Sequence, residues 1–231
     1  MTDRDNAFKG WTEGSSWLHV GPDGTEYVYV NIPKNASSWM KYQFNGREFD
    51  YLTTPYDKVT FVILLRDPID RWISGAAQAL YGCSPESDHF FLNVGYNSIF
   101  DQVALDEHTR CQHLFLKTKL YEKHNVVWFK CDANLKTNWE HWAKDKISPR
   151  MLGADRDTTT ANPFNISKLG VGNQFPGWYD QSTTVVGWTQ QQIKDTLVDH
   201  LNTCPRHLEK LKAYYRMDQE LIDSVEFYEA R

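Results

Sequence analysis

A strand that runs directly into a polar loop and a helix constrains the fold of this chain most. The run from Tyr27 to Ile32 is apolar and β-branched, which is typical of a buried strand. Pro33 ends the run, and small or polar residues follow until Trp39 begins a helical pattern. A strand–loop–helix turn points backbone N–H groups and a helix N-terminus at one spot. The segment therefore predicts an anion site, to which Lys34 adds a positive charge.

A second apolar run indicates where such a site would lie in a sheet. Residues 59–65 are almost continuously apolar, as in a strand buried on both faces of a parallel sheet. Arg66 follows at once, and Asp67 and Pro68 are a good N-cap and a good first-turn residue for a helix. Arg66 then stands at the carboxyl end of a strand, where open α/β sheets bind ligands. Ser74 lies about two helical turns further on, near the same face.

The order of the remaining elements predicts the fold class. Strands are expected at 27–32, near 48–52, at 59–65 and at 125–130, and helices at about 37–45, 68–80, 97–105, 134–144, 189–201 and 205–225. This alternation predicts an α/β, three-layer sandwich with a central parallel sheet and helices on both faces. Residues 1–26 are expected to be an irregular lead-in, and residues 148–187 a lid over the site. The chain length fits one domain over 1–231.

Both polar strings resemble motifs of the sulfotransferases that use 3′-phosphoadenosine 5′-phosphosulfate, PAPS. Residues 33–39 resemble the 5′-phosphosulfate loop, and residues 66–75 resemble the 3′-phosphate signature, in which an arginine and a later serine hold that phosphate. Weaker strings at 106–112, 126–135, 162–168 and 214–222 follow in the correct order and are closest to the carbohydrate-sulfotransferase branch. Cys111 and Asp132 depart from that branch's proline and glutamate. These departures leave the subgroup, and hence the acceptor, open.

The resemblance implies the sulfotransferase fold, which is a P-loop-like sandwich, and a reaction. The sulfuryl group of PAPS would move in line to an acceptor hydroxyl, with a saccharide slightly favoured, and 3′-phosphoadenosine 5′-phosphate, PAP, would be released without a metal. The nucleotide would contact the loop, the second string and the predicted lid: Lys34, Asn35, Ala36, Ser37, Ser38, Trp39, Arg66, Ser74, Ser167 and Lys168. Lys34 is also expected to be catalytic, because it can neutralise the charge that grows on the leaving oxygen.

The acceptor hydroxyl needs a base, for which the sequence offers several candidates. His108 is the first, since imidazole titrates near neutral pH and the residues around it resemble a family string. Three carboxylates are alternatives: Glu48, Asp50 and Glu107.

The composition limits the classes of partner that the protein is expected to bind. The formal net charge of −5 gives no general basic footprint, so no nucleic-acid partner is expected. No apolar run approaches the ~18 residues of a membrane span, and no signal-peptide pattern opens the chain, which predicts a cytoplasmic protein without membrane partners. The four cysteines favour free thiols and no metal site. A small-molecule or saccharide acceptor is the expected partner, and the oligomeric state stays open.

Two other functions remain open. A P-loop-like small-molecule kinase shares the phosphate cradle but needs a magnesium-binding Ser or Thr after the lysine, which Lys34-Asn35 does not supply. A catalytically inactive module that binds PAP or PAPS would keep the nucleotide site and lack the chemistry.

Overall fold

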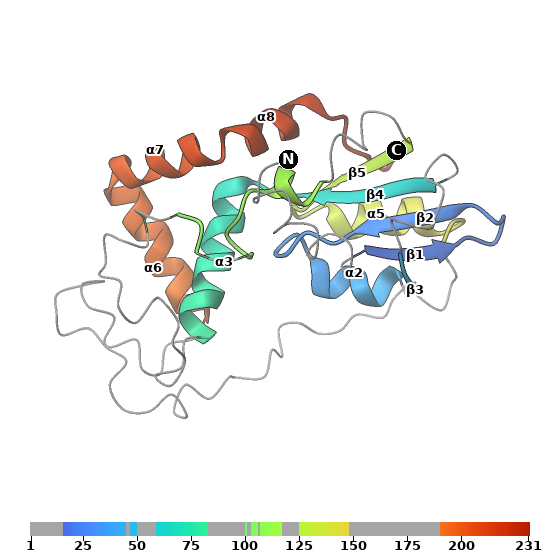
Figure 1. The fold of residues 1–231 in the computed structure, drawn as a ribbon, viewed down its shortest axis with the longest axis horizontal. Helices are drawn as coiled ribbons and strands as arrows, with labels where there is room; N and C mark the ends of the chain where they lie inside the picture. Colours follow the sequence, from blue (N-terminus) through green and yellow to red (C-terminus); the bar gives the residue numbers. More distant parts are fainter. Residues whose placement is uncertain are drawn as a thin grey trace, which may run out of the picture. The chain divides into compact units, whose positions relative to one another are not determined.

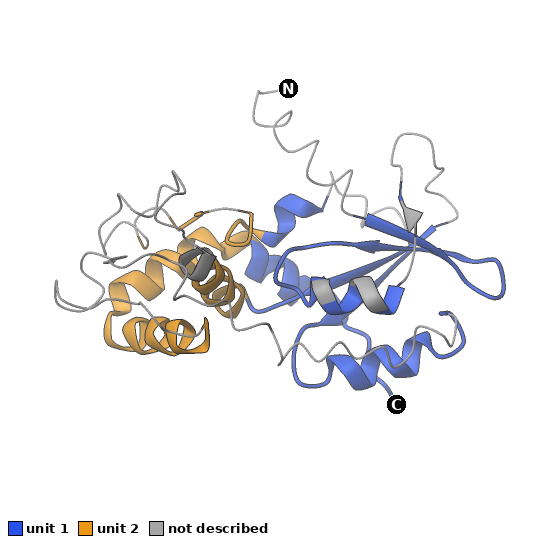
Figure 2. Ribbon diagram, turned by 90° about the horizontal axis from the view of Figure 1, so that it is seen from below, with its two compact units in different colours: residues 1–67, 112–158, 218–231 blue, residues 68–111, 159–217 orange. Residues whose placement is uncertain are grey.

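The computed structural model of this chain describes residues 16–44, 47–49, 59–82, 100, 103–105, 107–116, 125–147 and 190–231. The predicted lid at 148–187, with Ser167 and Lys168, lies outside the described residues, as does Asp50. The chain forms two compact units, coloured in Figure 2. The first comprises residues 1–67, 112–158 and 218–231, and the second residues 68–111 and 159–217. The expectation of one domain over 1–231 stays a prediction.

A mixed sheet forms the centre of the first unit (Figure 1). Its strands are β1 (Ser16–Val20), β2 (Glu26–Val30), β3 (Arg47–Glu48), β4 (Val59–Leu65) and β5 (Asn125–Lys130), in the order β3-β1-β2-β4-β5. Strands β2, β4 and β5 are parallel, whereas β1 pairs antiparallel with β2 and β3. The α/β class and the strands at 59–65 and 125–130 are confirmed. The expectation of a parallel sheet holds for β2, β4 and β5 and is wrong for β1, which runs antiparallel to both of its neighbours.

Strand β1 lies inside the predicted irregular lead-in, so that prediction was wrong for residues 16–20. A tight turn joins β1 to β2: the Asp23 carboxylate accepts hydrogen bonds from the backbone N–H and the hydroxyl of Thr25, both at 2.9 Å. Gly24 adopts a φ of 81°, which is in the left-handed region that glycine reaches at little cost. The polar residues that suggested an irregular segment are thus the turn of a hairpin.

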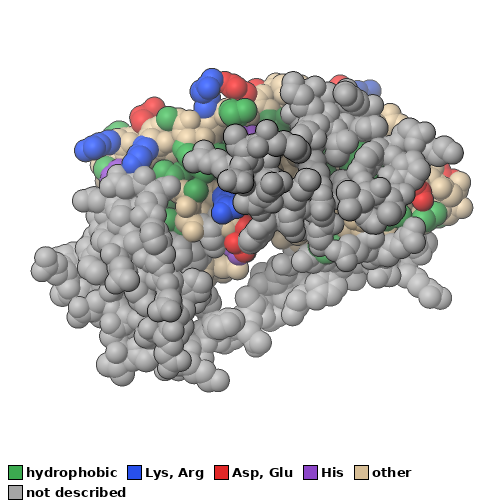
Figure 3. Space-filling model, viewed as in Figure 1, with side chains coloured by type: hydrophobic (Ala, Val, Ile, Leu, Met, Phe, Trp, Pro, Cys, Tyr) green, Lys and Arg blue, Asp and Glu red, His purple; other side chains and the backbone are tan. Residues whose placement is uncertain are grey.

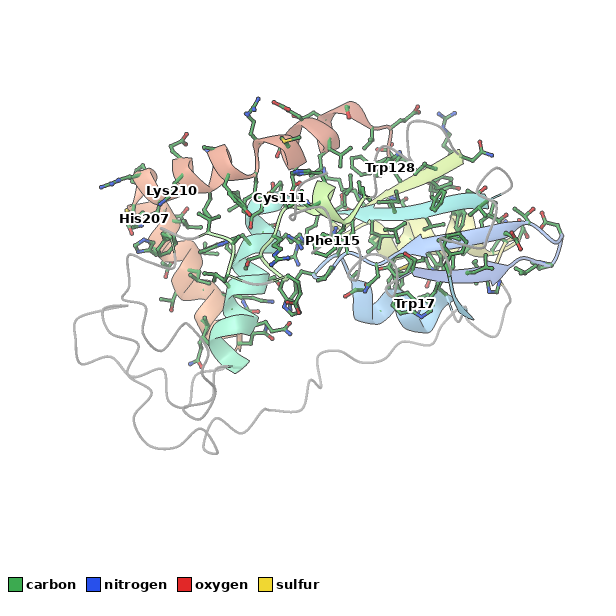
Figure 4. All side chains as sticks on the ribbon, viewed as in Figure 1. Trp17, Cys111, Phe115, Trp128, His207 and Lys210 are labelled. Atoms are coloured by element: carbon green, nitrogen blue, oxygen red, sulfur yellow. The ribbon has the colours of Figure 1, made fainter. Side chains whose placement is uncertain are left out.

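Helices cover both faces of this sheet, as predicted. On one face, Tyr27 and Tyr29 pack against α2 (Ser37–Phe44) and α5 (Leu135–Ala143). On the other, Val28 and Val30 join a cluster that includes Leu221 of α8 (Arg216–Ser224) and the short 3-10 helix η2 (Gln112–Phe115). Neighbouring residues of β2 point to opposite faces because side chains alternate along a strand. Figure 4 labels Trp17, which packs with the first cluster, and Phe115 and Trp128 of the second.

Helices make up most of the described part of the second unit. It contains α3 (Pro68–Gly82), α6 (Gln190–Thr203) and α7 (Pro205–Tyr214), which share a core with Trp72, Phe100 and Tyr215. The single helix predicted at 205–225 is in fact α7 and α8, separated at Tyr215. In the segment predicted as helical around 97–105, residues 103–105 are not helical, since Val103 has a φ of 56° and its carbonyl accepts a hydrogen bond from the Trp72 indole.

The surface of the described residues mixes both charges. On the face drawn in Figure 3, acidic and basic side chains lie side by side, and on α7 Lys212 contacts Glu209 at 2.8 Å. Among the described helices, none combines the length and the apolar character that crossing a membrane requires.

Candidate functional site: a phosphate-type loop at the sheet edge

The loop between β2 and α2 has an uncommon backbone. Lys34 has a φ of 70° and Ala36 a φ of 55°, so two residues that are not glycine lie in the left-handed region. Each such residue costs about 1–2 kcal/mol, and such conformations cluster at functional sites. Left-handed residues within a turn bring successive N–H groups to one side, which is how backbone nests bind anions. The loop therefore has the backbone of an anion site.

Helix α2 adds further N–H donors at the same point. The first backbone bond of the helix runs from the Met40 N–H to the Ala36 carbonyl at 2.9 Å. The N–H groups of Ser37, Ser38 and Trp39 precede that bond, so the helix itself offers them no partner. They lie at the positive end of the helix dipole, where an anion is stabilised.

Asn35 holds the loop against the sheet. Its N–H donates to the Ile32 carbonyl at 3.1 Å, and its fully buried side chain donates to the Leu64 carbonyl at 2.7 Å and to Gln112 Oε1 at 2.6 Å. The sequence predicted Asn35 as a nucleotide contact. In the structure its backbone N–H and its side-chain Nδ2 bind protein groups and so position the loop, while its contact with a nucleotide stays a prediction.

Arg66 lies beside the loop, at the end of the neighbouring strand. Its Nη1 donates to the Lys34 carbonyl at 3.3 Å. A guanidinium carries five N–H donors in a planar fork that suits phosphate, and this contact uses one of them. The loop and Arg66 thus form one cationic, donor-rich surface at the carboxyl ends of β2 and β4 in the first unit. Such a surface has the donors that a phosphate or sulfate ester needs.

The backbone of Arg66 is fixed by a residue that sequence reasoning gave no role. Gln112 is fully buried; its Oε1 accepts from the Arg66 N–H at 3.0 Å and its Nε2 donates to the Arg66 carbonyl at 2.7 Å. Because Oε1 also accepts from Asn35, one side chain links the loop to the end of β4. Gln112 belonged to a family-like string, and that string was the only signal for it.

Asp218 in turn holds Gln112. Its fully buried carboxylate accepts from the backbone N–H groups of Gln112 at 2.6 Å and His113 at 2.9 Å, and lies 2.6 Å from His113 Nδ1. A buried carboxylate is tolerated when donors surround it in this way. Asp218 therefore anchors the start of η2.

The thiol near this edge is inert. Cys131 follows β5, and its N–H donates to the Leu65 carbonyl at 2.7 Å. Burial raises the pKa of Cys131 to about 12, against a smaller lowering by the charge of Arg66. The thiol therefore stays protonated at neutral pH and is not a nucleophile.

Three of the predicted residues described by the structure, Ser74, Glu107 and His108, lie in the second unit. Ser74 is buried on α3, and the next residue, Gly75, lets the chain at His108 approach closely, since a Cβ there would lie 2.5 Å from the His108 carbonyl oxygen. The His108 imidazole lies with Nδ1 3.6 Å from Glu107 Oε1 and Nε2 3.5 Å from Gln78 Nε2. Two base candidates, His108 and Glu107, are thus neighbours.

Trp39 and Glu48 were also predicted as site residues, and the structure gives fewer contacts for them. Trp39 is half-buried and meets Trp139 of α5 edge to face, with ring centroids 6.2 Å apart. Glu48 lies in β3.

Comparisons of the chain with protein-family models, with curated proteins and with solved structures find no match.

Proposed function

We propose that this chain is a PAPS-dependent sulfotransferase that acts on an acceptor hydroxyl, with a saccharide as the first class to test. One observation carries the proposal: the left-handed loop at Lys34 and Ala36 lies against Arg66 from the next parallel strand. These are the two strings whose sequences resemble the 5′- and 3′-phosphate motifs of that family.

The proposed roles follow from the donors available. The N–H groups at the start of α2 would hold the 5′-phosphate without rearranging, which is electrostatic preorganisation. The acceptor oxygen would attack sulfur in line, and the bond from sulfur to the bridging oxygen would break as PAP leaves. The Lys34 ammonium would neutralise the charge on that oxygen, and Arg66 would bind the 3′-phosphate. The base that takes the hydroxyl proton stays a prediction from the sequence, with His108 first and Glu48, Asp50 and Glu107 as alternatives.

Binding of PAP to the full chain, measured by calorimetry, is the first test. Arg66→Ala should weaken PAP binding by roughly 10- to 100-fold, the equivalent of one or more charge-assisted hydrogen bonds, and should change AMP binding little, because AMP lacks the 3′-phosphate. Lys136→Ala is the matched control, since Lys136 is an exposed cation on α5. No heat with PAP at millimolar concentration would refute the proposal.

Transfer of labelled sulfate from PAPS to a library of acceptors is the second test. Lys34→Ala should lower kcat by roughly 100- to 1,000-fold and affect PAP affinity less, because the contact strengthens as the leaving oxygen gains charge. Tight PAP binding with no transfer to any acceptor would instead indicate an inactive module. Activity that requires both ATP and magnesium would indicate a kinase.

A further inference from the structure

Three metal-ligating side chains meet where α6 joins α7, in the second unit. His200 lies in the last turn of α6 and Cys204 lies between the helices. His207, labelled in Figure 4, lies in the first turn of α7. Their ligand atoms all lie within 4.8 Å of one another, and His200 Nε2 is 2.8 Å from His207 Nδ1. We call His200, Cys204 and His207 the corner cluster.

The backbone fixes the spacing of this cluster. The Cys204 N–H donates to the His200 carbonyl at 2.8 Å, and the His207 N–H donates to the Cys204 carbonyl at 3.0 Å. Cys204 occupies the N-cap of α7 and makes no side-chain capping hydrogen bond. Cysteine binds metals through its thiolate sulfur.

A buried aromatic ring sets the orientation of both imidazoles. Phe100 stacks on His200 with ring centroids 4.4 Å apart and on His207 at 4.5 Å, with an interplanar angle of only 2° for His207. The two imidazoles are themselves close to parallel, at 25°. Fixing the orientation of a histidine ring is what supporting residues do around metal ligands. The cluster is therefore ordered before any ion arrives.

We propose that the corner cluster binds a divalent ion of the zinc class through His200, Cys204 and His207. Two imidazole nitrogens and one thiolate form a donor set that suits Zn²⁺. On a tetrahedral zinc, two nitrogens lie about 3.3 Å apart, so the pair at 2.8 Å must open by roughly 0.5 Å. The ion takes the place of the proton shared by the imidazoles; that proton moves to the other nitrogen of its ring, and the thiol releases one proton on binding.

The position of the cluster indicates what the ion does. Its ligands come from the end of one helix, the start of the next and the residue between, so a bound ion holds the α6–α7 corner together. Three protein ligands leave one of four coordination positions to solvent, and all three side chains are half-exposed. The inference is independent of the proposed sulfotransfer, because every residue it uses differs from those assigned to the nucleotide.

A cobalt titration of the full chain, freed of metal with chelator, tests the site. Co²⁺ should bind one per chain, give the thiolate-to-cobalt charge-transfer absorption, and be displaced by Zn²⁺. Cys204→Ser should abolish that absorption, and His207→Asn should weaken binding by at least the roughly 10- to 100-fold that even supporting residues contribute. Cys131→Ser and His141→Gln are matched controls, since these residues lie in the other unit, and should leave both readouts unchanged.

A second measurement needs no variant. Zn²⁺ should protect Cys204 of the wild-type chain from alkylation, as read by mass spectrometry of its peptide, and should leave the labelling of the other cysteines unchanged. Three results would overturn the proposal: no charge-transfer absorption at millimolar Co²⁺, absorption that persists in Cys204→Ser, or equal alkylation of Cys204 with and without Zn²⁺.

Discussion

Replacing Gln112 by leucine tests whether the loop is held by the network beneath it. Leucine has a similar size and cannot hydrogen-bond, so the N–H and carbonyl of Arg66 both lose their Gln112 partner, while Asn35 keeps its bond to the Leu64 carbonyl. Each orphaned group costs about 1–3 kcal/mol, or about 2–6 kcal/mol for two. Arg66 is half-buried, so water recovers part of this, and we expect a loss of about 3 kcal/mol.

Urea unfolding of the full chain, followed by tryptophan fluorescence, measures this loss. The matched control is Gln219→Leu, since Gln219 is exposed on α8 and its side chain bonds only locally, to Asp223 at 2.9 Å; it should change the free energy of unfolding by less than about 0.5 kcal/mol. PAP affinity should fall with Gln112→Leu and not with the control. A Gln112→Leu variant that loses no more stability than Gln219→Leu would refute the reasoning.

Two further predictions concern stability away from the loop. Gly75→Ala should destabilise the chain by about 1–3 kcal/mol, because the new Cβ would meet the backbone of His108 at 2.5 Å; a thermal midpoint equal to wild type would contradict this packing. Burial lowers the pKa of His19 below 6.5, so the folded state keeps that imidazole neutral where the unfolded state is protonated. The free energy of unfolding should therefore fall as pH drops through 6.5, and urea titrations should show a flatter pH dependence for His19→Gln than for wild type.

The elements that the sequence predicted best are those whose pattern is set by burial alone. Residues 59–65 are an apolar run inside the sheet, residues 125–130 carry four apolar residues between two polar ends, and both strands were predicted to the residue. Strand β1 was missed, because the turn at Asp23 and Gly24 made its surroundings look irregular. The break between α7 and α8 was missed because the apolar pattern of the helix continues through Tyr215. In the structure Tyr215 separates the two helices and is buried, and its hydroxyl donates a hydrogen bond to the Thr109 carbonyl.

The candidate site also has a part that the sequence predicted and a part that it did not. The meeting of the loop with Arg66 was predictable, since carboxyl ends of parallel strands share one edge of a sheet. Gln112 and Asp218 act across separations of 46 and 106 residues, for which no local pattern exists. The sequence predicted no metal site, and the spacing His200-x₃-Cys204-x₂-His207 was not recognised, because only the helix bounds bring the three ligand atoms together.

The left-handed loop is explained by these distant contacts better than by its own residues. Neither lysine nor alanine favours a positive φ, so the local sequence would relax Lys34 and Ala36 toward ordinary conformations. Strained backbone persists only where its surroundings over-determine it. Here Asn35, between the two strained residues, is held by Gln112, and Gln112 is held by Asp218, through short bonds of buried groups. Since displacing any one group orphans the next, the carboxyl-terminal helix sets the conformation of a loop near the start of the chain.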